Sequence, residues 1–303
     1  MKTAETAAAN GWQDRFWQSE DGLALHYRDY PGPRDGAAMP VLCIPGLTRN
    51  ARDFHDLAMH LSRTRRVISV DLRGRGDSEF AKDSATYNPL QYAQDLEWLF
   101  PAAGIDQAIF IGSSLGGIVT MICAVIAPDR IGGAVLNDVG PVVELEGLLR
   151  IANYVGQGRS FPTWMHAARA LEEGHGHVHP EWGIIEWLAE AKRIMELGGN
   201  GRISFDYDMR IGDGLAEAAE EVARNDFWAG FEALAGRPVL VVRGEHSDVL
   251  SARTAQKMVE RNPDTELVTV LRTGHLPMLS LPPVLPAIER LVEQRLSSAA
   301  VAS

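Results

Sequence analysis

Residues 109–120 of the chain read Ile-Phe-Ile-Gly-Ser-Ser-Leu-Gly-Gly-Ile-Val-Thr. The apolar run Ala108 to Ile111 before the first glycine is typical of a buried strand, and the apolar segment that follows, as far as Ala127, is long enough for a helix. Between them lies a Gly-x-Ser-x-Gly pattern with Ser114 at its centre. A strand, small residues and a helix in this order predict a sharp turn that lifts the Ser114 hydroxyl clear of a sheet.

The same turn predicts chemistry at Ser114. The hydroxyl is presented for nucleophilic attack, and the backbone N–H of Leu115, at the start of the expected helix, points to the place where an oxyanion would form. The pattern alone also occurs in turns without any chemistry, so the prediction requires an acid and a base further along the chain, in that order. Asp248 and His275 meet this requirement.

Strands and helices alternate on both sides of this turn. Apolar runs predict strands at Val41–Ile44, Val67–Val70, Gly133–Leu136, Pro238–Val242 and Glu266–Leu271, and a hairpin formed by Phe16–Ser19 and Leu23–Tyr30. Helices are expected at Arg52–Leu61, Asn88–Phe100, Ala252–Glu260 and Val284–Leu296. Alternation of this kind predicts a parallel sheet with helices on both faces.

The alternation is interrupted between Pro141 and Pro238. From Val142 to about Ala235 the pattern is helical, with four of the seven tryptophans and no convincing buried strand. We therefore expect residues 142–235 to form an inserted helical cap on a core made of residues 1–141 and 236–303. Aromatic residues of the cap line either a substrate pocket or the cap's own core, and their spacing leaves both interpretations open: Trp164, Trp182, Trp187, Phe205 and Tyr207.

The composition of the chain indicates which binding partners and which cell compartment to expect. The formal net charge is −11, and no cluster of Lys and Arg stands out, which argues against nucleic acid or an anionic membrane surface. The two cysteines, Cys43 and Cys123, have aliphatic neighbours and are expected to be buried free thiols of a reducing compartment. Residues 1–10 lack the apolar region of a signal peptide and no run has the length of a membrane span, so a cytoplasmic location is expected.

From Phe16 to Leu296 the chain resembles the α/β-hydrolase family. The resemblance rests on five motifs: Pro45-Gly46, the Asp-Leu-Arg-Gly-Arg-Gly-Asp-Ser run at 71–78, the Gly-Ser-Ser-Leu-Gly-Gly run at 112–117, the turn from Gly244 to Asp248, and Gly274-His275. It implies an α/β fold with a mostly parallel eight-stranded sheet flanked by helices, an inserted helical cap, and nucleophile, acid and base in that chain order.

The resemblance also implies the roles of individual residues. Ser114 would be the nucleophile, His275 the general base and Asp248 the acid that orients it, while the backbone N–H groups of Leu47 and Leu115 would form the oxyanion hole.

Two positions leave questions open. Pro45 stands where the family usually has a histidine, but the expected donor at Leu47 is a backbone group, so this departure has little effect. Asp138 is an alternative acid, because it follows the last strand before the cap and some family members use that position; Glu245 is a third candidate. Asp248 is favoured because residues 243–248 match the family's acid-bearing turn, whereas Asp138 is explained as a turn-former before Gly140-Pro141.

Two other groups of side chains invite a functional interpretation. His175, His177 and His179 alternate in a glycine-rich loop, but neither a cysteine nor a clear carboxylate accompanies them, so we expect a flexible loop and no metal site. Arg49 and Arg52 follow the oxyanion loop and either steer a carboxylate or are solvated surface charges; the second interpretation is favoured. No cofactor is expected.

These observations predict a serine hydrolase that cleaves a small or medium carboxylic ester through an acyl-enzyme. Lactone opening and C–C bond cleavage of ring-cleavage products use the same apparatus and are alternatives. A ligand receptor of the same fold, with slow or no turnover, is an alternative of another class. The expected partner is a small-molecule ester or lactone, and dimerisation through the cap or the final helix is worth testing.

Overall fold

A computed structural model describes residues 11–33 and 38–301 of the chain. The first ten residues, to which the signal-peptide argument applied, lie outside this part. The main feature is an eight-stranded sheet with the order β1-β2-β4-β3-β5-β6-β10-β11. The strands are β1 (Gln13–Gln18), β2 (Ala24–Tyr30), β3 (Val41–Ile44), β4 (Val67–Val70), β5 (Ala108–Ser113), β6 (Ile131–Asn137), β10 (Val239–Gly244) and β11 (Thr265–Val270).

The sheet is parallel except at one edge. β1 and β2 form the expected antiparallel hairpin, and β2 pairs antiparallel with β4. All pairs from β4 to β11 are parallel. Every residue of β3, β4, β5, β6 and β10 is buried, as expected of strands that are covered on both faces. The predicted mostly parallel sheet is confirmed.

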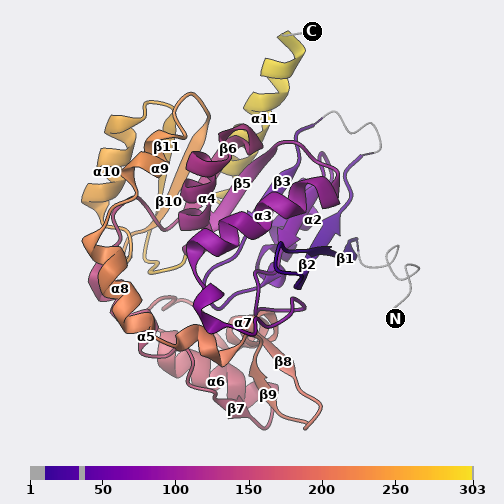
Figure 1. Ribbon diagram of the computed structural model, residues 1–303. Coiled ribbons are helices and arrows are strands. Elements are labelled where there is room, and N and C mark those ends of the chain that lie inside the picture. The colour runs from indigo at the N-terminus through magenta and orange to yellow at the C-terminus, as the bar shows by residue number, and fades with distance from the viewer. Residues whose placement is uncertain (1–10, 34–37, 302–303) are drawn as a thin grey trace.

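Helices cover both faces of this sheet (Figure 1). They are α2 (His55–Leu61), which follows the 3₁₀ helix η2 (Ala51–Phe54), and α3 (Pro89–Ala103), α4 (Leu115–Ile126), α10 (Ala252–Arg261) and α11 (Leu285–Val301). One apolar core contains residues of α3, α4 and α10, and a second core contains residues of α2 and α11. Successive residues of β3 alternate between them, because Leu42 belongs to the first core and Cys43 to the second.

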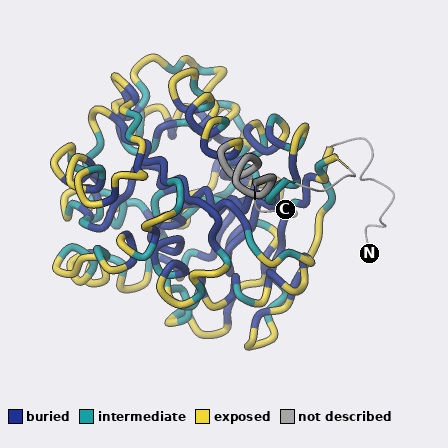
Figure 2. The backbone as a smooth tube through the Cα atoms, turned by 90° about the horizontal axis from the view of Figure 1, so that it is seen from above, coloured by how far each residue is buried: buried dark blue, intermediate teal, exposed yellow. Residues whose placement is uncertain are grey.

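The five fully buried strands lie in the interior of the molecule, where the backbone is dark blue in Figure 2. Burial of one large apolar side chain stabilises a fold by about 1.5–3 kcal/mol, and many such side chains, Phe110 among them, are fully buried here. Cys43 and Cys123 are buried and free, as predicted, and burial raises the pKa of both thiols.

Residues 142–235, which we call the inserted segment, connect β6 to β10 and gather mainly at one end of the sheet (Figure 1). Their helices are α5 (Leu145–Ala152), α6 (Trp164–His175), α7 (Ile184–Ile194), α8 (Leu215–Arg224) and α9 (Trp228–Glu232). The segment also holds a three-stranded sheet of β7 (Ser160–Phe161), β9 (Ile203–Phe205) and β8 (Met195–Leu197). None of these three strands is buried along its length, in keeping with the expectation of no convincing buried strand, and strands of two or three residues are too short to leave a periodic pattern.

Among the described residues, no helix combines the length and apolar character needed to cross a membrane.

Candidate active site

Ser114 lies on the sharp turn between β5 and α4. Its backbone has φ 51° and ψ −114°, a conformation that a residue with a side chain rarely adopts. The glycines of the motif make this turn sterically feasible. A Cβ atom at Gly112 would lie 2.3 Å from the carbonyl oxygen of Gly116, and one at Gly116 would lie 2.1 Å from the carbonyl oxygen of Ile44. The predicted strand, turn and helix around Ser114 are therefore confirmed.

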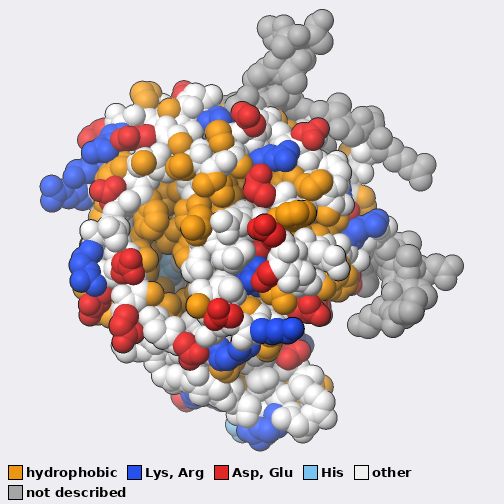
Figure 3. Space-filling model, in the orientation of Figure 1, with side chains coloured by type: hydrophobic (Ala, Val, Ile, Leu, Met, Phe, Trp, Pro, Cys, Tyr) orange, Lys and Arg blue, Asp and Glu red, His pale blue; other side chains and the backbone are white. Residues whose placement is uncertain are grey.

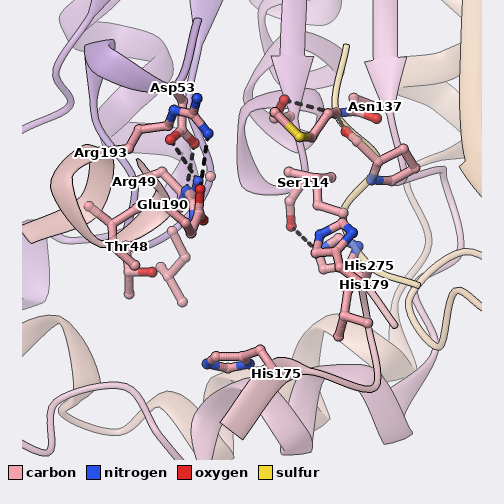
Figure 4. A pocket seen from close by; sticks show the side chains of 18 of the residues that line it. Thr48, Arg49, Asp53, Ser114, Asn137, His175, His179, Glu190, Arg193 and His275 are labelled. Carbon is pink, nitrogen blue, oxygen red and sulfur yellow. Dashed lines mark hydrogen bonds and ion pairs between the residues drawn. The ribbon is translucent and has the colours of Figure 1, made fainter. Parts of the chain in front are cut away.

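Three side chains from different parts of the chain form a continuous series of hydrogen bonds. Nε2 of His275 lies 2.9 Å from Oγ of Ser114, and Nδ1 of His275 lies 2.7 Å from Oδ2 of Asp138. A carboxylate only accepts hydrogen bonds, so Nδ1 donates to Asp138 and Nε2 is left to accept the serine proton. Figure 4 shows Ser114 and His275 facing each other at the border of an open cavity.

Asp138, and not Asp248, holds the position beside His275. The backbone N–H of Asp138 donates to the carbonyl of Val242 at 2.8 Å, and its Oδ1 accepts from the N–H of Gly244 at 2.9 Å. With φ 57° at Asp138, these bonds direct the second carboxylate oxygen to the imidazole. The side chain of Asp138 is fully buried.

The expectation that Asp248 contacts His275 was therefore wrong. Asp248 forms a two-point ion pair with Arg150 of α5, whose Nε and Nη2 lie 2.5 and 2.9 Å from its carboxylate oxygens. Burial disfavours the ionised form of Asp248, but the hydrogen bonds and charge of Arg150 outweigh burial, so the pKa of Asp248 lies below its usual value. Glu245, the third candidate, accepts from the backbone N–H of Arg272.

The loop after β3 lies directly against the Ser114 turn. A Cβ atom at Gly46 would lie 3.7 Å from Cβ of Ser114. Nε of Arg75, a fully buried side chain, donates to the carbonyl of Leu47 at 2.8 Å and so fixes this loop. Within the described part of the chain, the backbone N–H groups of Leu47 and Leu115 donate to no protein acceptor, so both remain available to a ligand.

A cavity of about 190 Å³ lies beside Ser114. Figure 3 shows hydrophobic side chains gathered around a hollow in the surface. Four of the aromatic residues singled out in the sequence line the cavity: Trp182, Trp187, Phe205 and Tyr207. Trp164 does not line the cavity; it packs against the core of the inserted segment. The cavity thus lies between the end of the sheet and the inserted segment.

A charged wall faces Ser114 across the cavity (Figure 4). Arg49 donates to both carboxylate oxygens of Asp53, at 2.6 and 2.7 Å, and to Glu190 of α7. Glu190 also accepts from Arg193 at 3.1 Å. Arg52 similarly pairs with Asp206 at 2.6 Å. The expectation that Arg49 and Arg52 are solvated surface charges was wrong, because the inserted segment brings carboxylates to both.

The three histidines of the glycine-rich loop separate in the structure. His175 and His179 line the cavity, whereas His177 is exposed and does not. Among the described residues, the one group with the spacing of metal ligands is His26 with Asp71 and Asp77, so the loop histidines form no such group. The loop is docked on the segment that follows β11 and carries His275, because the carbonyl of Val178 accepts from the N–H of Gly274 at 3.0 Å.

Comparison with known proteins identifies the family of the fold. Residues 39–281 match the sequence profile of a family described as alpha/beta hydrolase fold. The chain is 32% identical over 270 residues to a 3-hydroxybutyrate-oligomer hydrolase of Cupriavidus necator, which covers 86% of this chain and 91% of that protein. It is 36% identical over 242 residues to Esterase YbfF of Escherichia coli, with 78% and 85% covered.

A solved structure has the same architecture. The alpha/beta hydrolase from Novosphingobium aromaticivorans superposes with a TM-score of 0.88 at 55% sequence identity, covering 94% of this chain and 99% of that one. The profile match spans most of the chain, and the structural similarity extends over nearly all of it. This chain belongs to the alpha/beta hydrolase fold family.

Proposed function

We propose that this protein is a serine hydrolase that cleaves a small or medium carboxylic ester through an acyl-enzyme. The observation that carries the proposal is the series of hydrogen bonds from Ser114 through His275 to Asp138, with distances of 2.9 and 2.7 Å. In this arrangement a weak hydroxyl nucleophile has a base in contact, and the base has a carboxylate that fixes its tautomer.

The reaction would proceed in two halves. In the first, Nε2 of His275 takes the proton of Ser114 as Oγ attacks the ester carbonyl, and the N–H groups of Leu47 and Leu115 donate to the oxyanion. The imidazolium then gives the proton to the departing alkoxide, which leaves as the alcohol. In the second half, water replaces the alcohol and the same proton transfers release the carboxylic acid. Asp138 accepts the hydrogen bond from Nδ1 of His275 in both halves.

The cavity supports a small or medium substrate. Its volume of about 190 Å³ lies below the range of about 300–1,000 Å³ that is typical of pockets for drug-sized ligands. The inserted segment supplies much of the lining and would serve as a cap that excludes water from the acyl-enzyme. The two relatives are named as an oligomer hydrolase and an esterase, and both names favour ester hydrolysis.

The test is steady-state hydrolysis of p-nitrophenyl esters from acetate to octanoate, by the protein and by Ser114→Ala. We expect turnover by the protein and a fall in kcat of at least about 10⁴-fold in the variant, because the nucleophile is absent. Labelling of Ser114 by a fluorophosphonate, detected by mass spectrometry, gives a readout that does not depend on the ester chosen. Equal rates for the two proteins would contradict the proposal.

Lactones and vinylogous diketones belong in the same panel, because lactone opening and C–C bond cleavage use the same residues. Faster turnover of either class than of every ester would replace the ester assignment while keeping the mechanism. Labelling of Ser114 without turnover of any substrate would favour a ligand receptor of this fold.

A further inference from the structure

Two histidines in the cavity make no side-chain hydrogen bond to any described residue. His175 is the last residue of α6, and its ring meets that of Tyr154 edge to face, with centroids 5.0 Å apart. The ring of His179 stacks on Trp182, with centroids 3.9 Å apart and an interplanar angle of 4°. A stacked ring keeps its nitrogen atoms at the edge, so His179 has both nitrogens available to a bound molecule.

Both rings are held in place relative to Ser114. Val178 lies between them in the sequence, and its carbonyl accepts from the N–H of Gly274, next to His275. The approach is close, because a Cβ atom at Gly274 would lie 3.3 Å from Cα of Val178. Both histidines line the cavity that Ser114 borders, and Figure 4 shows His175 below Ser114 in that view. A molecule bound at Ser114 would therefore meet two fixed imidazoles.

Both imidazoles are neutral near pH 7. Burial, with a further contribution from Arg150, lowers the pKa of His175 to about 4. Burial also lowers the pKa of His179 to about 4, although Glu190 opposes the shift. A neutral imidazole carries one N–H donor and one acceptor nitrogen. Each such ring can therefore bind a hydroxyl group, which both donates and accepts a hydrogen bond.

A carboxylate fits this cavity less well. Each arginine that lines it is already paired with a carboxylate of the chain. Arg49 pairs with Asp53 and Glu190, and Arg193 pairs with Glu190. Arg150 pairs with Asp248. An anionic group of a substrate would have to displace one of these pairs, whereas a hydroxyl group would leave them intact.

We propose that His175 and His179 form a subsite for a hydroxyl group, so that the preferred substrates are esters that carry a hydroxyl on the acyl or the alcohol part. This inference rests on the proposed ester hydrolysis at Ser114. Replacement of either ring by a group without hydrogen-bonding atoms removes the subsite but leaves the nucleophile and its base in place.

The experiment compares kcat/KM within two matched pairs of substrates. Methyl 3-hydroxybutyrate against methyl butyrate tests a hydroxyl on the acyl part, and 2-hydroxypropyl butyrate against propyl butyrate tests one on the alcohol part. We expect kcat/KM to be at least about tenfold higher for the hydroxylated member of one pair. One well-placed hydrogen bond of about 1.4 kcal/mol corresponds to a factor of about ten. The pair that shows it identifies the part that carries the hydroxyl.

His175→Phe and His179→Phe keep an aromatic ring, and each should lower this preference at least fivefold. His177→Phe is the matched control, because His177 belongs to the same loop but is exposed and lies outside the cavity; it should keep the preference. The preference is a ratio measured in one preparation, so a fraction of unfolded protein does not alter it. Equal rates within both pairs, or an unchanged preference in both cavity variants, would overturn the subsite.

Binding to Ser114→Ala separates failure of the subsite from failure of the proposed function. Calorimetric titration should show tighter binding of the hydroxylated member than of its partner, and His179→Phe in the same background should remove the difference. If the protein hydrolyses no ester but this difference in affinity is found, ester hydrolysis is wrong and the hydroxyl subsite stands. If the protein hydrolyses esters without any hydroxyl preference, the subsite alone is wrong.

Discussion

Oδ2 of Asp138 lies 2.7 Å from Nδ1 of His275, although 137 residues separate them in the sequence. Asp248, the residue that the acid-bearing turn indicated, is bound to Arg150 instead. The strands that precede the two aspartates, β6 and β10, are neighbours in the sheet, so both carboxylates reach the same edge. We therefore expect substitutions of the two aspartates to have different effects on catalysis.

We expect Asp138→Asn to lower kcat for ester hydrolysis by about 10³–10⁴-fold, because the amide no longer holds the imidazole in the tautomer that accepts the serine proton. Asp248→Asn is the matched control and should lower kcat by less than about tenfold. Both variants are measured with the same p-nitrophenyl ester. A larger loss in Asp248→Asn than in Asp138→Asn would contradict the assignment of the acid.

Gly116→Ala should destabilise the fold by about 3 kcal/mol or more, because its Cβ atom would lie 2.1 Å from a backbone oxygen that cannot move alone. Gly199→Ala is the control, since a Cβ atom there meets nothing within 4 Å. The free energy of unfolding of each variant is measured by urea titration. Equal stability of the two variants would show that the Ser114 turn tolerates a side chain.

Glu190→Gln should lower the free energy of unfolding by about 2–4 kcal/mol, because it removes the carboxylate that Arg49 and Arg193 share at a largely buried site. The exposed pair of Arg224 and Glu220 in α8 provides the comparison, and Glu220→Gln should change stability by less than about 1 kcal/mol. Thermal or urea unfolding measures both. A change of similar size in the two variants would mean that the charged wall contributes little to docking of the inserted segment.

Because His175 and His179 are half-buried and neutral in the folded protein, we expect the protein to lose stability in mild acid. The pKa of His179 is about 4 in the folded protein and about 6.5 in an unfolded chain, so the unfolded state binds more protons between these values. This contribution to stability is complete above pH 6.5 and is lost as the pH falls toward 4. Between pH 7 and pH 5 the loss from His179 is about 2 kcal/mol. His179→Phe should therefore show a smaller difference in unfolding free energy between these pH values than the unaltered protein, and an equal difference would count against burial of a neutral imidazole.

The sequence predicts the sheet well, because its central strands are fully apolar. The runs Val41–Ile44 and Val67–Val70 coincide with β3 and β4, and the glycine pattern places the turn at Ser114. The short strands β7, β8 and β9 of the inserted segment were missed, since two or three residues show no period.

The contacts of the site depend on tertiary structure. Arg49 and Glu190 are 141 residues apart, and no local pattern connects them. The choice between Asp138 and Asp248 depends on a left-handed backbone at Asp138 and on the position of Arg150. The backbone conformation at Asp138 and the position of Arg150 both depend on how the inserted segment and the neighbouring strands pack. The residue types alone do not specify this packing.

The hydrogen bond from Gly274 to Val178 ties the lining of the cavity to the residue that precedes His275. A displacement of this loop away from Gly274 would break the bond, and the backbone beside His275 would then lose one of its restraints. A molecule that enters without displacing the loop would leave this restraint on the imidazole intact.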